Sequence, residues 1–180
     1  MKKGMYVALV ICAVSIFSVA CIDKPASNMV QGSNPVSSEA VSTTSPDKTN
    51  EQSQEINVYY ADVQVSKLEE HTQTIVFNDD TQKYSATYAA LQDSKQKDLI
   101  PLWGTIDLRS DTFAQGKLTL DIHIPNEARL GAGGEALAIE ALKKTFFQFN
   151  EVTSIEVLVD GKETDSLMGH TELTNPITRE

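Results

Sequence analysis

Cys21 is the residue whose chemistry the sequence defines most sharply. It follows Ser18-Val19-Ala20, in which an aliphatic residue and then a small residue precede the cysteine, as the cleavage of a bacterial lipoprotein signal requires. A thiol is the side chain that can accept a diacylglyceryl group through a thioether bond. The sequence therefore predicts lipidation of Cys21. Cys12 follows the bulky Ile11 and cannot be the modified residue.

The residues before Cys21 fit the same prediction. Lys2 and Lys3 form a short basic segment, and the apolar run from Met5 to Val19 is too short for a membrane-spanning helix. We expect a signal peptide over residues 1–20 and a mature chain held by lipid at the extracytoplasmic face of the bacterial cell membrane. The alternative is an ordinary cleaved signal peptide that happens to end beside a cysteine.

The remaining reactive side chains show no catalytic pattern. The three histidines are far apart in the sequence, without the spacing of metal ligands, and no serine lies in a G-x-S-x-G context. Adjacent acidic residues at the ends of elements usually cap a helix or solvate a surface. We predict no enzyme activity, no cofactor and no metal site, and we assign no role to these side chains: His71, His123, His170, Glu69-Glu70 and Asp79-Asp80.

The charge of the chain limits its binding partners. It has 15 basic and 25 acidic residues, a net charge of -10 at neutral pH. Without Lys2 and Lys3 the mature form would carry -12. Nucleic acids and anionic lipid head groups require basic patches, so we expect no nucleic-acid partner. Neutral glycans and proteins remain open.

The sequence divides into a signal, a tether and one domain. Residues 21–54 contain the predicted lipidation site and a stretch rich in Ser, Thr, Pro, Asn and Gln that has no aromatic residue. Such a stretch cannot bury enough apolar surface to offset the entropy of ordering it, so we expect a flexible tether. Residues 55–180 carry periodic apolar patterns, and their number is sufficient for one domain with a core.

These periodic patterns predict an α+β fold. Alternating or β-branched segments indicate strands at 56–60, 74–77, 105–109, 118–124 and 155–159, and residues 111–116 are expected to form a hairpin loop. One helix is expected after Asp80, and the carboxylates of Asp79 and Asp80 can cap its start. A second helix is expected over residues 135–149. The order β-β-α-β-β-α-β favours a mostly antiparallel sheet with two helices packed on one face.

The second helix has a single apolar stripe, which we interpret as core: Ile139, Leu142, Phe146 and Phe149. In the preceding strand, Leu118, Leu120, Ile122 and Ile124 are expected to point inward. Polar residues are expected on the opposite face of the sheet: Asp107, Arg109, Thr119, Asp121 and His123. A mixed-charge face of this kind suits lateral contacts between proteins, although a solvated face has the same composition.

Several segments, in their order and spacing, resemble the GerMN domain of sporulation and spore germination proteins. The resemblance covers most of residues 56–179. It rests on the opening strand 56–60, the turn Pro101 to Gly104-Thr105, the segment Gly116-Lys117-Leu118-Thr119-Leu120-Asp121, the Gly134-Glu135 helix start, the Phe146 and Phe149 stripe, the segment 152–161, and His170 and Pro176.

The resemblance implies a fold and a class of function. The family is similar to the ring-building motifs of sporulation channel complexes, whose core order α-β-β-α-β matches Tyr84 to Val159 here. Its members are often secreted or lipid-anchored and bind other envelope proteins, and catalysis is not their known role. Sporulation members usually carry two copies in tandem, whereas this chain has one.

Two functional hypotheses follow. The first is a lipid-anchored interaction module of the cell envelope that binds another envelope protein or itself, with a link to sporulation or spore germination. The second is a lipoprotein that binds peptidoglycan or glycan fragments through Trp103, the single tryptophan, and tyrosines such as Tyr59. An exposed Trp103 would offer a platform to a partner or a sugar ring, whereas a buried one would only close the edge of the sheet.

Overall fold

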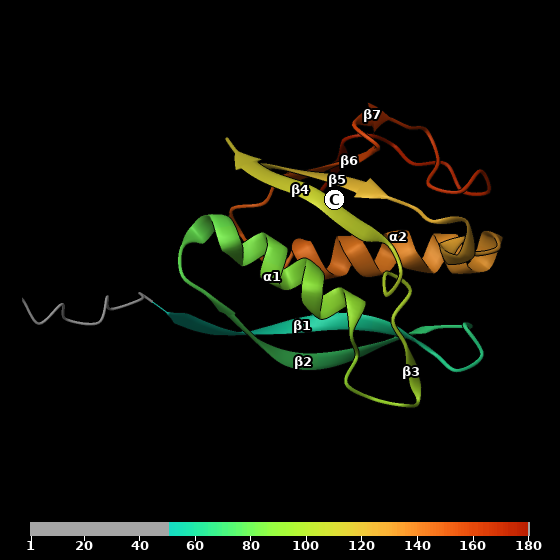
Figure 1. Ribbon diagram of the computed structural model, residues 1–180, viewed down its shortest axis with the longest axis horizontal. Helices are drawn as coiled ribbons and strands as arrows, with labels where there is room; N and C mark the ends of the chain where they lie inside the picture. Colours follow the sequence, from blue (N-terminus) through green and yellow to red (C-terminus); the bar gives the residue numbers. More distant parts are fainter. Residues whose placement is uncertain (1–50, 180) are drawn as a thin grey trace, which may run out of the picture. The chain divides into compact units, whose positions relative to one another are not determined.

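The computed structural model describes residues 51–179. Two sheets enclose a layer of two helices (Figure 1). The elements follow the order expected from the sequence, two strands and a helix, then further strands, a second helix and a last group of strands. The α+β class, the mostly antiparallel pairing and the presence of two helices are therefore confirmed.

The first sheet has the strand order β2-β1-β3. It contains β1 (Gln52–Asp62), β2 (Leu68–Phe77) and the short β3 (Leu99–Ile100). The β1–β2 pair is antiparallel and in continuous register from Gln52 opposite Phe77 to Ala61 opposite Leu68. The carboxylate of Asp62 stabilises the connecting turn, because it accepts hydrogen bonds from the Ser66 N–H and hydroxyl at 2.7 and 2.8 Å.

Helix α1 (Asp80–Gln92) begins where its sequence provides a cap. The Asp79 carboxylate accepts hydrogen bonds from the backbone N–H groups of Thr81 and Gln82 at 2.9 and 3.1 Å, as the sequence predicts. Its buried face includes Tyr84, Tyr88 and Leu91. At the other end, Tyr60 of β1 donates a 2.6 Å hydrogen bond to the Ala90 carbonyl and so satisfies an acceptor of the last turn.

The second sheet has the order β4-β5-β6-β7, with β8 also paired to β6. Its strands are β4 (Asp107–Ala114), β5 (Lys117–His123), β6 (Ser154–Val159), β7 (Lys162–Glu163) and β8 (Ile177–Thr178). Strands β5 and β6 are parallel, because the chain crosses between them through the short helix η1 (Asn126–Ala128) and the helix α2 (Ala132–Phe146). The other pairs are antiparallel.

The core lies between the two sheets and around the helices. Leu118, Leu120 and Ile122 of β5 are fully buried, as their alternation predicts, and Ile124 is 8% exposed. Helix α2 buries Leu142 and Phe146, and Phe149 lies just beyond its end. Ile139, the first residue of the predicted stripe, is only half-buried.

The division into two sheets is the main difference from the expected single sheet with helices on one face. Helix α1 packs on both sides. Tyr88 donates a 3.1 Å hydrogen bond to the Ile106 carbonyl just before β4, while Ala86 and Ala90 lie beside β2. One sheet covers each side of α1, and this arrangement buries the helix more completely than a single sheet would.

The hairpin between β4 and β5 is tighter than the expected loop at 111–116. Strand β4 continues to Ala114, and only Gln115 and Gly116 form the turn, with φ of 52° and 83°. Two positive φ values are typical of the two-residue turn that matches the twist of a hairpin. Asp160 and Gly161, predicted as a turn, have the same pattern with φ of 52° and 74°.

The amino-terminal predictions fall largely outside the described residues. The signal peptide at 1–20, Cys21 and most of the predicted tether at 21–54 lie outside the described residues. Strand β1 begins at Gln52, three positions before the expected start of the domain at 55. None of the helices in residues 51–179 is long and apolar enough to cross a membrane.

Candidate functional site

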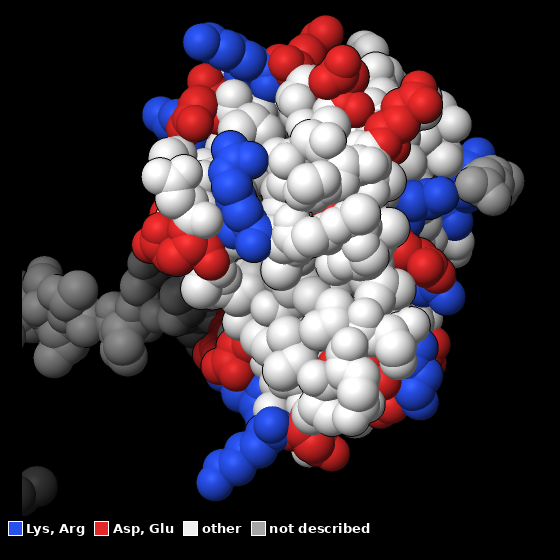
Figure 2. Space-filling model, turned by 90° about the vertical axis from the view of Figure 1, so that its right-hand side faces the viewer, with Lys and Arg blue, Asp and Glu red and all other residues white. Residues whose placement is uncertain are grey.

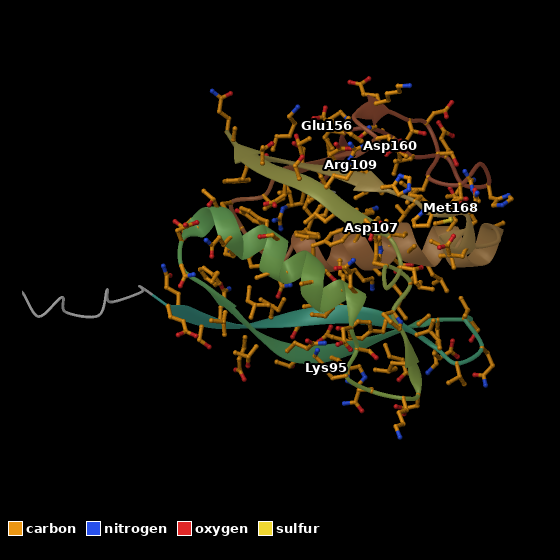
Figure 3. All side chains as sticks on the ribbon, in the orientation of Figure 1. Lys95, Asp107, Arg109, Glu156, Asp160 and Met168 are labelled. Atoms are coloured by element: carbon orange, nitrogen blue, oxygen red, sulfur yellow. The ribbon has the colours of Figure 1, made fainter. Side chains whose placement is uncertain are left out.

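The polar face that the sequence predicts on strands 105–109 and 118–124 exists. On β5, Lys117, Thr119, Asp121 and His123 alternate with the buried residues and point away from the helices. We call this surface of β4, β5 and β6 the outer sheet face, defined by eight residues: Asp107, Arg109, Lys117, Thr119, Asp121, His123, Glu156 and Asp160. Arg109, Glu156 and Asp160 lie on the same side of this sheet in Figure 3.

Asp160 joins Arg109 and His123 at one end of the outer sheet face. Its Oδ1 lies 2.8 Å from Nη1 of Arg109 and 2.9 Å from Nδ1 of His123. Hydrogen bonding from His123, reinforced by Arg109, lowers the pKa of the Asp160 carboxyl below its usual range. A register shift between Leu108 and Ser110 is the local irregularity that accommodates Arg109 on this strand.

Glu156 organises the other end of the face. Its Oε2 accepts hydrogen bonds from Nζ of Lys117 at 2.9 Å and from the Thr119 hydroxyl at 2.8 Å. These two bonds lower the pKa of the Glu156 carboxyl. Between the two ends, Asp121 accepts a 2.7 Å hydrogen bond from the Gly161 N–H and holds the β6–β7 turn against β5. Hydrogen bonds and ion pairs therefore connect the charged groups of the face to one another.

Trp103 lies in the core. Its side chain is 1% exposed, its Nε1 donates a 2.9 Å hydrogen bond to the Ala138 carbonyl of α2, and its ring meets Tyr88 edge-on with centroids 5.7 Å apart. The possible partner or glycan contact at Trp103 is therefore corrected, because the ring cannot reach a ligand at the surface. A large flat side chain fills the space between α1 and α2 here.

Tyr59, named with Trp103 in the glycan hypothesis, does not form a platform with it. Its hydroxyl hydrogen bonds to Glu70, and the Lys144 ammonium lies 5.3 Å from the ring centroid. Burial, together with the hydrogen bond and charge of Glu70, raises the pKa of the Tyr59 hydroxyl to about 12. The Tyr59 hydroxyl and ring each already contact a neighbouring charged side chain, Glu70 and Lys144 respectively.

The other candidate side chains are dispersed. His71 lies on β2, His123 is on the outer sheet face, and His170 is in the segment after β7. Asp79 caps α1, and Glu69 pairs with Lys67 at 2.9 Å. No group of three histidine, cysteine or acidic residues within 51–179 could hold a metal ion.

Glu135 is a buried residue that links the start of α2 to residues 166–170, and the sequence does not predict this role. It is 0% exposed at the start of α2, and its carboxylate accepts hydrogen bonds from the Ser166 hydroxyl, the Met168 N–H and the His170 N–H at 2.8, 2.8 and 3.0 Å. Burial raises the pKa of this carboxyl, but the hydrogen bonds outweigh it, so the pKa lies below its usual value. An acidic residue among small residues at a helix start was the available signal.

The segment that Glu135 holds forms one end of the domain, where Met168 is labelled in Figure 3. The same end faces the viewer in Figure 2, which shows uncharged residues at its centre and charged residues around the margin. A separate groove follows the exposed side of α2, with an apolar floor and basic residues beside it. Its lining residues are Ala136, Ile139, Glu140, Lys143, Lys144, Phe147 and Arg179.

Comparison with known families identifies the domain. The sequence model described as "Germane: Sporulation and spore germination" matches residues 57–165, more than half of the chain. The chain belongs to the Germane family. The resemblance to GerMN domains that the sequence suggests is thus confirmed.

The solved structures similar to this Germane chain include three with related descriptions. The first GerMN domain of the sporulation protein GerM from Bacillus subtilis has a TM-score of 0.55 at 14% identity, over 70% of this chain and 98% of that one. This likeness shows the fold. The tandem GerMN domains of GerM score 0.48 at 19% identity, over 71% of this chain and 46% of theirs.

The third structure is a candidate lipoprotein from Clostridium perfringens, with a TM-score of 0.48 and 19% identity. The match covers 76% of this Germane chain and 93% of the Clostridium perfringens chain. No curated protein matches the sequence.

Proposed function

We propose that this Germane protein is a non-enzymatic interaction module of the bacterial cell envelope, held by lipid on Cys21 at the extracytoplasmic face of the membrane. The module binds an envelope protein in a process linked to sporulation or spore germination. The family supports the link to these processes. The cysteine after Ser18-Val19-Ala20 supports the anchor.

The observation that carries the proposal is the pattern of paired charges on the outer sheet face. Arg109, His123 and Asp160 form one cluster and Lys117, Thr119 and Glu156 form another. Charged side chains that are already oriented lose little conformational entropy on binding, and their alternating signs favour one partner and one register over others. Such a surface suits a protein partner with complementary charges.

The glycan hypothesis has less support. Binding of a sugar ring requires an accessible aromatic face; Trp103 is buried, and the Lys144 ammonium lies 5.3 Å from the centroid of the partly exposed Tyr59 ring. Self-association remains an outcome that the test below can report.

The proposal is tested by crosslinking the full chain in living cells and identifying the captured proteins by mass spectrometry. We expect a specific envelope protein to be captured by the wild type and lost with Arg109→Glu. Lys162→Glu is the matched control, because it makes the same charge change on the exposed strand β7. Equal capture by both variants, or none by the wild type, would exclude the outer sheet face as the binding surface.

A further inference from the structure

We infer that the free edge of β2 is a second binding site, which takes an extended, basic segment of a partner protein as an added strand. The segment would lie in the groove between β2 and α1. The inference rests on the proposed function only in assuming a protein partner, and it concerns a surface separate from the outer sheet face.

The directions of the backbone groups follow from the β1–β2 register. The Asp62 N–H donates to the Lys67 carbonyl at 3.1 Å, which makes this pair a hydrogen-bonded one. Hydrogen-bonded and non-bonded pairs alternate in an antiparallel ladder. The even-numbered residues of β2 therefore direct their N–H and C=O groups away from β1, toward the open edge: Glu70, Thr72, Thr74 and Val76.

Asn57 verifies this assignment independently. It is opposite Thr72 in the register, so the same alternation requires its backbone groups to point away from β2. Both of them do, because the Asn57 N–H and C=O each form a 2.8 Å hydrogen bond with the side-chain amide of Gln148, on the far side of β1.

The other strands of six or more residues in the described part of the chain have closed or distorted edges. Gln148 occupies the edge of β1 at Asn57. On β6, the side chain of Asn175 fills the gap between β7 and β8 through bonds of 3.0 and 2.8 Å to the Val157 N–H and C=O. Strand β4 carries a register shift and the inward-facing Asp111, whose carboxyl pKa burial raises. Bulges and inward charges both protect an edge from pairing.

Strand β2 lacks such protection over its second half. It ends the β2-β1-β3 order, its register is unbroken over ten residues, and residues 72–77 contain no charge, glycine or proline. Within residues 51–179 no hydrogen bond from another strand, loop or side chain reaches the outward backbone groups of Thr72, Thr74 and Val76. Val76 is also 50% exposed, which is high for a large apolar residue.

A groove accompanies this edge and has room for the side chains of an added strand. Its volume is about 420 Å³, and it runs between residues 73–76 of β2 and the alanines of α1, with Lys95 beside it (Figure 3 labels Lys95). Ala86, Ala89 and Ala90 are short, so the backbone of a fourth strand can approach β2 without meeting the helix. An edge strand beside a helix is a recurrent site for peptide addition.

Exposed acidic residues beside the edge indicate the kind of segment, since Lys95 in the groove is already paired with Asp93. Glu70 and Glu55 lie on the sheet face turned away from the helices, opposite Tyr59 and Thr74 respectively. The Tyr59 hydroxyl binds one oxygen of the Glu70 carboxylate, which retains further acceptor capacity. A matching segment would therefore alternate Lys or Arg on this face with small or β-branched residues toward the alanines.

The test places a photoreactive benzoylphenylalanine at Thr72, Thr74 or Val76 of the full chain in its own cells. An added strand requires that the captured site on one partner moves by two residues each time the probe moves by two. We expect this two-residue shift. With the probe at Val76, we also expect Thr74→Pro, which removes one outward N–H, to lower capture about tenfold.

Control variants separate a binding effect from misfolding. Proline with its missing N–H toward solvent is tolerated on an edge strand, so Thr74→Pro should retain the thermal unfolding midpoint within a few degrees. Thr74→Val keeps the N–H and should keep capture. Combining Glu55→Gln with Glu70→Gln should weaken capture about threefold if the segment is basic.

Each other outcome overturns the inference. Capture of residues 22–50 of the same chain, or of β2 from a second copy, would replace the partner protein with this chain itself. Capture without the two-residue register would exclude strand addition. No capture at β2, while a probe at Thr119 still captures a protein, would leave the proposed function intact. No capture from either surface would remove both.

Discussion

The side-chain amide of Gln148 pairs with the backbone of Asn57 as another strand would, donating to its C=O and accepting from its N–H at 2.8 Å each. The amide also donates to the Thr145 carbonyl near the end of α2 at 2.6 Å. One residue therefore closes the edge of the first sheet and links that sheet to the second helix. Asn175 forms the equivalent bonds to Val157 in the second sheet.

Replacing Gln148 with alanine should lower the free energy of unfolding by about 2 kcal/mol, because two backbone groups lose their partners at a half-buried position. Chemical denaturation monitored by circular dichroism measures the change. Gln64→Ala is the control, since this side chain is exposed in the β1–β2 turn and should change stability by less than about 0.5 kcal/mol. Equal losses for the two variants would show that the pairing with Asn57 contributes nothing.

Glu135 should make stability depend on pH. Its carboxyl has a lowered pKa in the folded state, so the ionised form stabilises the fold above the unfolded pKa, and this contribution is lost as pH falls through the folded pKa. Glu135→Gln should cost about 2 kcal/mol at neutral pH and much less in acid. Denaturation at both pH values, with the exposed Glu140→Gln as control, measures this. A cost independent of pH would rule out a role for the charge.

Gly116 and Gly161 both have positive φ, but their surroundings differ. A Cβ on Gly116 would lie 2.6 Å from Oγ1 of Thr153, whereas one on Gly161 would meet nothing within 4 Å. Gly161→Ala should therefore cost only the backbone strain, about 1 kcal/mol, and Gly116→Ala clearly more. Thermal unfolding of the two variants gives the comparison. If Gly161→Ala were the less stable variant, the result would contradict the close contact between Gly116 and Thr153 in the β4–β5 turn.

Trp103 should behave as a core residue in solution. Because it is the single tryptophan and is 1% exposed, its fluorescence reports this position alone. We expect blue-shifted emission and little quenching by acrylamide in the native protein, with strong quenching after denaturation. Strong quenching in the native state would place the ring at the surface and restore the glycan hypothesis.

Elements with a strict period were predictable from the sequence. The alternation from Leu118 to Ile124 specified β5 and its outward face, and Asp79 specified the start of α1. Turn chemistry was equally informative at Asp160-Gly161. In each case the information is local, since the residue types determine the period, the cap or the turn without reference to distant parts of the chain.

Long-range features could not be predicted in the same way. The two-sheet arrangement depends on which strands pair, and the pattern of β1 and β2 fits one sheet or two equally well. Strand β4 carries Asp111 on its inward face, which breaks the alternation, so the sequence pattern of its second half predicts a loop. Trp103 and Glu135 are buried through partners 35 and 31 to 35 positions away, and local sequence patterns do not identify those partners.

The central claim is that this domain works at a membrane surface from a lipid on Cys21, and metabolic labelling tests it most directly. Cells that express the full chain are given an alkyne-bearing fatty acid, and the purified protein is examined for the label. We predict that the wild type and Cys12→Ala are labelled and that Cys21→Ala is not. Equal labelling of Cys21→Ala and the wild type, or an unlabelled wild type, would contradict the claim.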